Sequence, residues 1–164
     1  MSIGFRNSYH IRCVHQNGAI GWVDEVKNLT THEGLSEILD KFWRGNTYNA
    51  AHYVALTGAS PTFAARDRLS AHPGWAEEAA YDEPSRIDLS LGTVNAQSVN
   101  NSGSKAVFTF SNTVTIGGAF ITTDSVKAGT AGVLMGGAAF LGGDRVVNAG
   151  DQLEITVNLS AMSS

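Results

Sequence analysis

The chain has 164 residues, is 43% hydrophobic and 16% charged, and carries a formal net charge of −4 from 11 basic and 15 acidic side chains. This length and composition exclude a disordered chain and a membrane-spanning one, and they favour a single β-rich domain over residues 1–164 with a buried core. The basic residues form no cluster along the sequence, so we also expect no binding to nucleic acid.

Cys13 is the single cysteine. It cannot form an intramolecular disulfide, and one cysteine offers no cysteine-based zinc site. We expect a reduced, partly buried thiol. Residues 1–7 lack the apolar core of a secretory signal, which favours a protein folded in the cytoplasm.

The first predicted element is a β-hairpin. Apolar and polar residues alternate over 9–14, and a second apolar run follows over 20–23. Asn17-Gly18 lies between the two runs, and this pair tolerates the positive φ angles of a tight turn.

An amphipathic helix is predicted over residues 31–44. Thr30 and Glu33 have the spacing of a capping box. The apolar positions recur at i, i+3, i+4, i+7 and i+8, as Leu35, Ile38, Leu39, Phe42 and Trp43. Gly45 favours the left-handed conformation that ends a helix. A helix with one apolar stripe is expected to pack on the sheet, which would place Trp43 in the core.

A strand over 51–57 is followed by a long loop or arm over 58–85. A loop of this length is usually functional, so we expect partner contacts here. Trp75 and Tyr81 are predicted to hold the loop to the body and to offer these contacts, with Trp75 as an exposed aromatic anchor.

From residue 86 the hydrophobic pattern has period two. It predicts strands over 87–91, 106–110, 114–120, 133–140 and 153–159, with a bulge at Gly117-Gly118 and a turn over 148–151. Many short strands separated by Gly, Asn and Asp favour an antiparallel β-sandwich or jelly-roll-like domain, with the helix packed on it.

The histidines offer little chemistry. They lie at positions 10, 15, 32, 52 and 72, with no metal-binding spacing among them. A site built from His10, His52 and a carboxylate is conceivable after folding, but solvated or hydrogen-bonded histidines are the favoured interpretation.

Catalytic constellations are also weak. Asp67, Ser70 and His72 contain the residue types of a nucleophilic triad, but they are too close together on one loop to face one another. The acidic residues 77–78 and 82–83 are interpreted as a solvated loop. We therefore expect no catalytic residue, no cofactor and no metal site, and hence no enzyme.

Several stretches together resemble small structural proteins of tailed-phage virions. They are residues 9–22, 26–35, 53–58, 71–75, 115–120 and 148–153. The resemblance implies a capsid decoration (cement) protein that contacts the major capsid protein and copies of itself in the virion, with a tail-associated protein as the next choice. It assigns a chemical role to no residue.

Two further hypotheses remain open. A receptor- or glycan-binding module of a tail fibre or baseplate would need exposed aromatic residues such as Trp75. A small hydrolase would need His52 or His72 within hydrogen-bonding distance of a nucleophile in a pocket.

Overall fold

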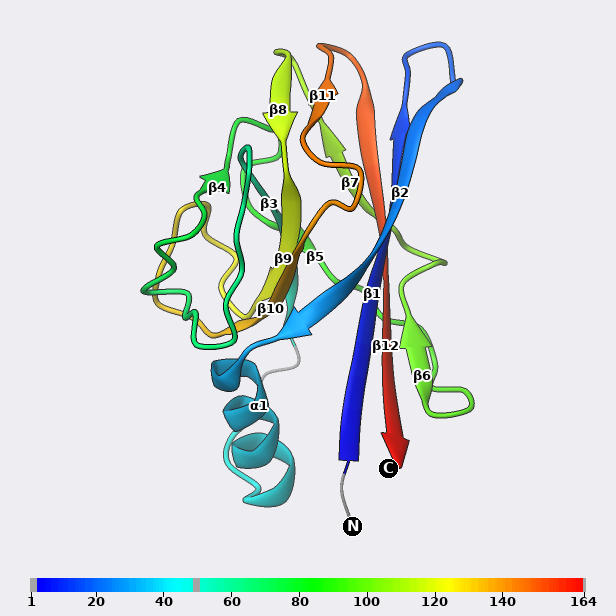
Figure 1. Cartoon of the computed structure of the whole chain (residues 1–164). Coiled ribbons are helices and arrows are strands. Elements are labelled where there is room, and N and C mark those ends of the chain that lie inside the picture. The colour runs from blue at the N-terminus through cyan, green and yellow to red at the C-terminus, as the bar shows by residue number, and fades with distance from the viewer. Residues whose placement is uncertain (1–2, 49–50, 164) are drawn as a thin grey trace.

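The computed structural model describes residues 3–48 and 51–163, and within them the chain is mainly β, an antiparallel curled sheet with one short helical segment (Figure 1). The strands are β1 (Ile3–Val14), β2 (Ile20–Thr30), β3 (Tyr53–Thr57), β4 (Glu77–Glu78), β5 (Ile87–Asp88), β6 (Ser98–Asn100), β7 (Ala106–Thr109), β8 (Val114–Ile116), β9 (Gly118–Thr122), β10 (Leu134–Ala139), β11 (Arg145–Val147) and β12 (Gln152–Ser163). The helical segment consists of α1 (His32–Ile38) and the π-helical turn η1 (Leu39–Trp43). None of the helices in the described part of the chain is long and apolar enough to cross a membrane.

Strand β2 belongs to both halves of the sheet. The strand order is β4-β3-β9-β10-β2-β1-β12-β6, with β5 paired to β3, β7 paired to β12, and β8 paired separately to β11. Residues 20–28 of β2 pair with β1, whereas residues 29–30 pair with β10. The sheet therefore curls around β2. One half contains β3, β9 and β10, the other contains β1, β12 and β6, and the two halves stand side by side (Figure 1).

The main core lies between these two halves. Along β1 the buried positions are Tyr9, Ile11 and Cys13, which alternate with outward-facing residues as the pleat requires. They join the same cluster as Val54 of β3 and Ile121 of β9. The core is thus built from strands that are distant in the sequence, and the predicted β-rich architecture is confirmed at this level.

The predicted hairpin is also confirmed. β1 and β2 pair antiparallel, and Gly18 in the connecting turn has a φ of +82°. The Asn17 side-chain oxygen accepts a hydrogen bond from the Ala19 N–H at 2.9 Å, which stabilises the turn.

The connection over 58–85 covers the sheet. β3 and β9 are buried on both faces, since Val54 faces the main core while Ala55 and Phe120 belong to a second cluster. Leu69 and Trp75 complete that second cluster from the connection itself. The segment therefore lies against the outer face of the sheet instead of extending from the body.

The helix begins one residue later than predicted, and its cap differs. Thr31, not Thr30, is the N-cap, and its hydroxyl accepts a hydrogen bond from the Gly34 N–H at 3.0 Å. Glu33 is not part of a capping box, because its Oε2 accepts from the backbone N–H groups of Leu69 and Leu134. The helix is thereby tied to the 58–85 connection and to β10.

The predicted packing of the helical stripe on the sheet is wrong. The first turn lies against β10, where Gly34 is buried beside the Met135 backbone. The following turns extend past the end of β10, at the level of the lower parts of β1 and β12 (Figure 1). Trp43 is 60% exposed and is not a core residue. The reason is that the sheet closes its core on its own strands, so no apolar face remains for the helix.

Candidate functional sites

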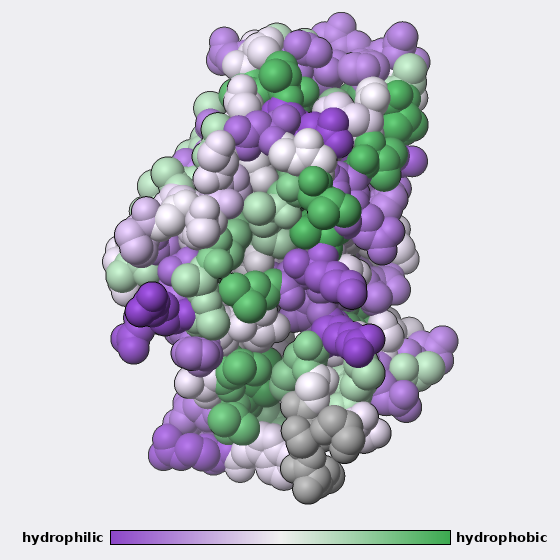
Figure 2. Space-filling model, in the orientation of Figure 1, coloured by the Kyte–Doolittle hydropathy of each residue, from purple (hydrophilic) through white to green (hydrophobic). Residues whose placement is uncertain are grey.

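An apolar face of the helical segment is exposed to solvent. Its side chains are 37% (Leu35), 58% (Leu39), 76% (Phe42) and 60% (Trp43) exposed. We refer to these four residues as the apolar helical face. The rings of Phe42 and Trp43 meet edge to face, with centroids 5.4 Å apart. Figure 2 shows hydrophobic side chains at the surface over the end of the molecule where α1 lies.

The charged residues of the same segment pair with one another. Asp40 lies 2.9 Å from the Arg44 guanidinium and 3.5 Å from the Lys41 ammonium, and Lys41 also lies 4.0 Å from Glu37. A hydrogen bond from Asn46, outweighing a smaller burial effect and assisted by Lys41 and Arg44, holds the pKa of Asp40 below its usual value. The segment therefore offers a partner apolar surface instead of unbalanced charge.

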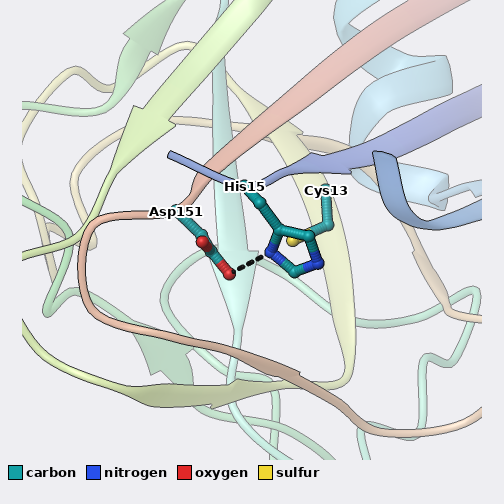
Figure 3. Close-up of side chains that lie close together, drawn as sticks. All are labelled: Cys13, His15 and Asp151. Atoms are coloured by element: carbon teal, nitrogen blue, oxygen red, sulfur yellow. Dashed lines mark hydrogen bonds and ion pairs between the residues drawn. The ribbon is translucent and has the colours of Figure 1, made fainter. Parts of the chain in front are cut away.

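A second group of functional side chains lies at the other end of the sheet. Cys13 and His15 are two residues apart on β1 and the turn that follows it, and Asp151 ends the turn before β12 (Figure 3). One ligand atom from each residue lies within 4.8 Å of those from the other two. His15 Nδ1 lies 2.9 Å from Asp151 Oδ2, in a hydrogen bond that the ring N–H donates to the carboxylate.

The three side chains differ in their exposure to solvent. Cys13 and Asp151 are buried, whereas the His15 side chain is 40% exposed. Burial, with a smaller effect of the Asp151 charge, raises the pKa of the Cys13 thiol to about 11. The thiol is therefore protonated at neutral pH and lies out of contact with solvent, which is the opposite of an activated nucleophile.

A shallow depression of about 420 Å³ adjoins this cluster. Asp151 forms part of its wall, together with residues from the segments around 16, 82, 109–111 and 149–152. Cys13 and His15 are not among the residues that line it.

Sequence reasoning missed this cluster for a definite reason. Cys13 lies in the predicted strand over 9–14 and His15 directly follows it, but Asp151 is 136 residues away from His15. Only the antiparallel register of β1 with β12 brings the three together, with Cys13 opposite Leu153. The lone cysteine excludes a cysteine-based zinc site, but a mixed set of one thiol, one imidazole and one carboxylate has no local signature in the sequence.

The histidines considered earlier are not joined into a site. Among the described residues, His15 is the histidine that lies in a group of metal-ligating side chains. His10 lies on the outward face of β1, in a small hollow with Arg12, Lys105 and Glu154. His52 is half-buried just before β3.

Trp75 and Tyr81 are buried, with exposed fractions of 7% and 3%. The expected exposure of Trp75 is therefore wrong. Its ring stacks on His72 at a centroid distance of 3.7 Å, and its indole N–H donates to Asp67. The two aromatic residues hold the connection to the body as predicted. Contact with a partner through them stays a prediction, and their burial argues against it.

Asp67, Ser70 and His72 have structural surroundings. Asp67 accepts from the Ala64 N–H and from the Trp75 indole, while His72 Nδ1 lies 2.9 Å from the Trp75 carbonyl oxygen. Ser70 is exposed. Asp67 and His72 thus both engage Trp75, and they stabilise the connection over the sheet.

The acidic residues of this connection are hydrogen-bonded and not merely solvated. Glu83 accepts from the Thr109 N–H and hydroxyl, and Asp82 accepts from the N–H and hydroxyl of Ser111. Glu77 forms a two-fold ion pair with Arg86. Glu77, Asp82 and Glu83 therefore fasten the connection to neighbouring segments, whereas Glu78 accepts from the Ala80 N–H within the connection itself.

No protein-family model matches the chain, and the comparisons with curated proteins and with solved structures give no match either. Inference about function therefore rests on the residues and their arrangement.

Proposed function

We propose that this chain is a structural assembly protein that decorates a tailed-phage capsid, held there by the apolar helical face. The observation that carries the proposal is the exposure of Phe42 and Trp43 on a segment that extends past the end of β10. Large apolar side chains gathered on one exposed surface typically mark a protein–protein contact. The proposed role is non-catalytic, and the proposed location is the virion.

The size of the face suits the centre of an interface. Its four side chains expose an area on the order of 500 Å², given the surface of large aromatic residues. Burying this area contributes ~12 kcal/mol, which is comparable to the ~4–15 kcal/mol lost in association. A stable complex therefore needs additional contacts around the face.

The face alone is smaller than a complete interface. Any protein docked on this face alone would bury about 1,000 Å² in total, less than the ~1,600 Å² of a standard interface. An apolar groove with a polar rim would supply the remainder. We assign this groove to the major capsid protein, in keeping with the resemblance of the sequence to virion structural proteins.

The sheet suits this role as a rigid support. We infer that the curled sheet is a sandwich of the jelly-roll type, because buried residues of β1, β7 and β12 face those of β3 and β9 across one core. A rigid body of this kind can hold the helical segment in one orientation across a symmetric lattice.

Purified phage particles provide the first test. Mass spectrometry is expected to detect the chain at a copy number comparable to that of the major capsid protein. Absence of the chain from purified particles would overturn the proposal.

A binding experiment tests the surface. Purified capsids that lack the chain are mixed with it and sedimented. The variant Phe42→Glu/Trp43→Glu is expected to lose binding at least tenfold, because two charges would be desolvated in the interface. Leu141→Glu is the matched control, since Leu141 is 82% exposed on the connection between β10 and β11. Equal binding of the two variants would exclude the helical face as the contact.

A further inference from the structure

We propose that Cys13, His15 and Asp151 form a binding site for a divalent transition-metal ion, Zn²⁺ above all, at the end of the sheet opposite α1. This proposal is independent of the assembly role. It rests on one thiol, one imidazole and one carboxylate that the fold brings together from opposite ends of the chain (Figure 3).

The donor set fits the chemistry of zinc. Cysteine, histidine and aspartate are all zinc ligands, with metal–ligand bonds of about 2.0–2.3 Å. Bound as thiolate, neutral imidazole and carboxylate, the three residues carry a charge of −2, which balances a divalent cation. Calcium and magnesium prefer six or more oxygen ligands, so this set discriminates against both.

The geometry fits as well. Bonds of this length place neighbouring donor atoms of a tetrahedral site ~3–4 Å apart. In the structure the donor atoms lie within 4.8 Å of one another, and the His15 and Asp151 atoms are 2.9 Å apart. Small rotations of the side chains are therefore enough to bring all three onto one ion, and the remaining coordination position is left for water.

The surroundings add an outer contact to the site. Asn148 Nδ2 lies 3.5 Å from Asp151 Oδ2, which places an amide beside the carboxylate as an outer contact. The His15 side chain is 40% exposed, so the cluster is open to solvent at the imidazole. A bound ion would cross-link the β1–β2 turn to the β11–β12 turn.

Titration of the chelator-treated full-length chain with Co²⁺ tests the site. We expect one Co²⁺ per chain and a thiolate-to-cobalt charge-transfer absorption, which Zn²⁺ abolishes by displacement and Ca²⁺ and Mg²⁺ do not. Zn²⁺ at 100 times its Kd is expected to raise Tm by roughly 5–10 °C.

Three variants localise the binding. Cys13→Ala is expected to lose the charge-transfer absorption, and His15→Gln to weaken Co²⁺ binding at least tenfold. His15 is partly exposed, so its replacement leaves the core intact even if Cys13→Ala fails to fold. The matched control is His10→Gln, on the outward face of the same strand, which is expected to bind as the parent chain does.

The outcomes separate cleanly. The site is supported if the parent chain binds one Co²⁺ ion and if this binding is weakened in His15→Gln but unchanged in His10→Gln. Absence of Co²⁺ binding at submillimolar concentration overturns it, and so does binding that is unchanged in His15→Gln.

Discussion

The buried cation Arg86 joins the end of the 58–85 connection to the loop between β9 and β10. Its guanidinium donates to both carboxylate oxygens of Glu77, to the Asp124 carbonyl and to the Gly129 carbonyl, at 2.7–3.0 Å. The Arg86 side chain is 1% exposed and that of Glu77 7%. A buried ion pair of this kind adds little net stability to the fold. Removing one partner is nevertheless strongly destabilising, because it leaves an uncompensated buried charge.

Arg86→Ala is therefore expected to lower the free energy of unfolding by about 3–5 kcal/mol. Urea denaturation followed by circular dichroism measures the loss. Lys105→Ala is the comparison, since the Lys105–Glu154 pair is partly exposed and is expected to contribute less than about 1 kcal/mol. Similar losses in the two variants would contradict the buried role of Arg86.

Glu154 makes the stability depend on pH. Burial tends to raise its pKa, but hydrogen bonds from Arg12 and Lys105 outweigh this and lower the pKa from its usual 4.5. A depressed carboxyl pKa stabilises the fold above the unfolded-state value, and the contribution is lost as the pH falls through the folded-state value.

Glu154→Gln should consequently cost stability at pH 6–7, by less than about 1 kcal/mol, and cost progressively less below about pH 4.5. Paired urea titrations of parent and variant across pH 3–7 measure the difference. High salt should reduce the cost at pH 7, because the pair is partly exposed. A cost that grows as the pH falls would refute this account of Glu154.

At the scale of the element, α1 is positioned by a close backbone contact. A Cβ added to Gly34 would lie 2.5 Å from the Met135 carbonyl oxygen, closer than real contacts allow. Gly34→Ala is expected to push α1 away from β10 and to destabilise the chain by about 1–3 kcal/mol. Gly103→Ala is the control, because its Cβ would meet no atom within 4 Å. Thermal unfolding of both variants checks the difference, and equal midpoints would mean that this contact does not position α1.

The helical segment is expected to be the first site of proteolysis. Phe42, Trp43 and Tyr48 are exposed aromatic residues, whereas Trp75 and Tyr81 of the 58–85 connection are buried. Proteases cut where the backbone is exposed and opens locally. Brief digestion with chymotrypsin should therefore cut within 42–48 before 75–81, as mass spectrometry of the fragments will show. The reverse order would mean that the connection is a mobile arm.

The elements that the sequence predicts well are those set by local pattern. The Asn17-Gly18 hairpin and the alternation along β12 depend on neighbouring residues, and both are observed. The exposure of Trp43 and the burial of Trp75 depend instead on which surfaces the sheet leaves open. That is decided by how β2 passes between the halves of the sheet, and periodicity carries no information about it.

The same limit applies to the candidate sites. Cys13 and His15 lie two residues apart in the sequence, but Asp151 joins them only through the pairing of β1 with β12. Arg86 was likewise not singled out, because its partners come from separate segments. Pairings between distant segments have no local signature in a single sequence.

At the scale of the whole molecule, the sheet depends on contact between the two ends of the chain. β1 pairs with β12 from Ile3–Ser163 to Val14–Gln152, so the two strands lie side by side over their whole length, next to β6 in the strand order. β12 also carries β6 and β7, and its inward side chains Leu153, Ile155 and Val157 are fully buried. The core therefore closes only when the last strand is in place.

A chain truncated after Gly150 is accordingly expected to be unfolded, not merely one strand shorter. It would lose the buried side chains of β12 and expose both β1 and β7, whereas a domain of this size has a net stability of only about 5–15 kcal/mol. Urea titration followed by circular dichroism should show a cooperative transition for the full-length chain and none for the truncated one. Refolding of the full chain should be slow, in milliseconds to seconds, because the pairing of β1 with β12 joins residues more than a hundred positions apart. A cooperative transition in the truncated chain would show that β10, β9 and β3 form a stable unit without β12, and the curled sheet would then be two separable parts.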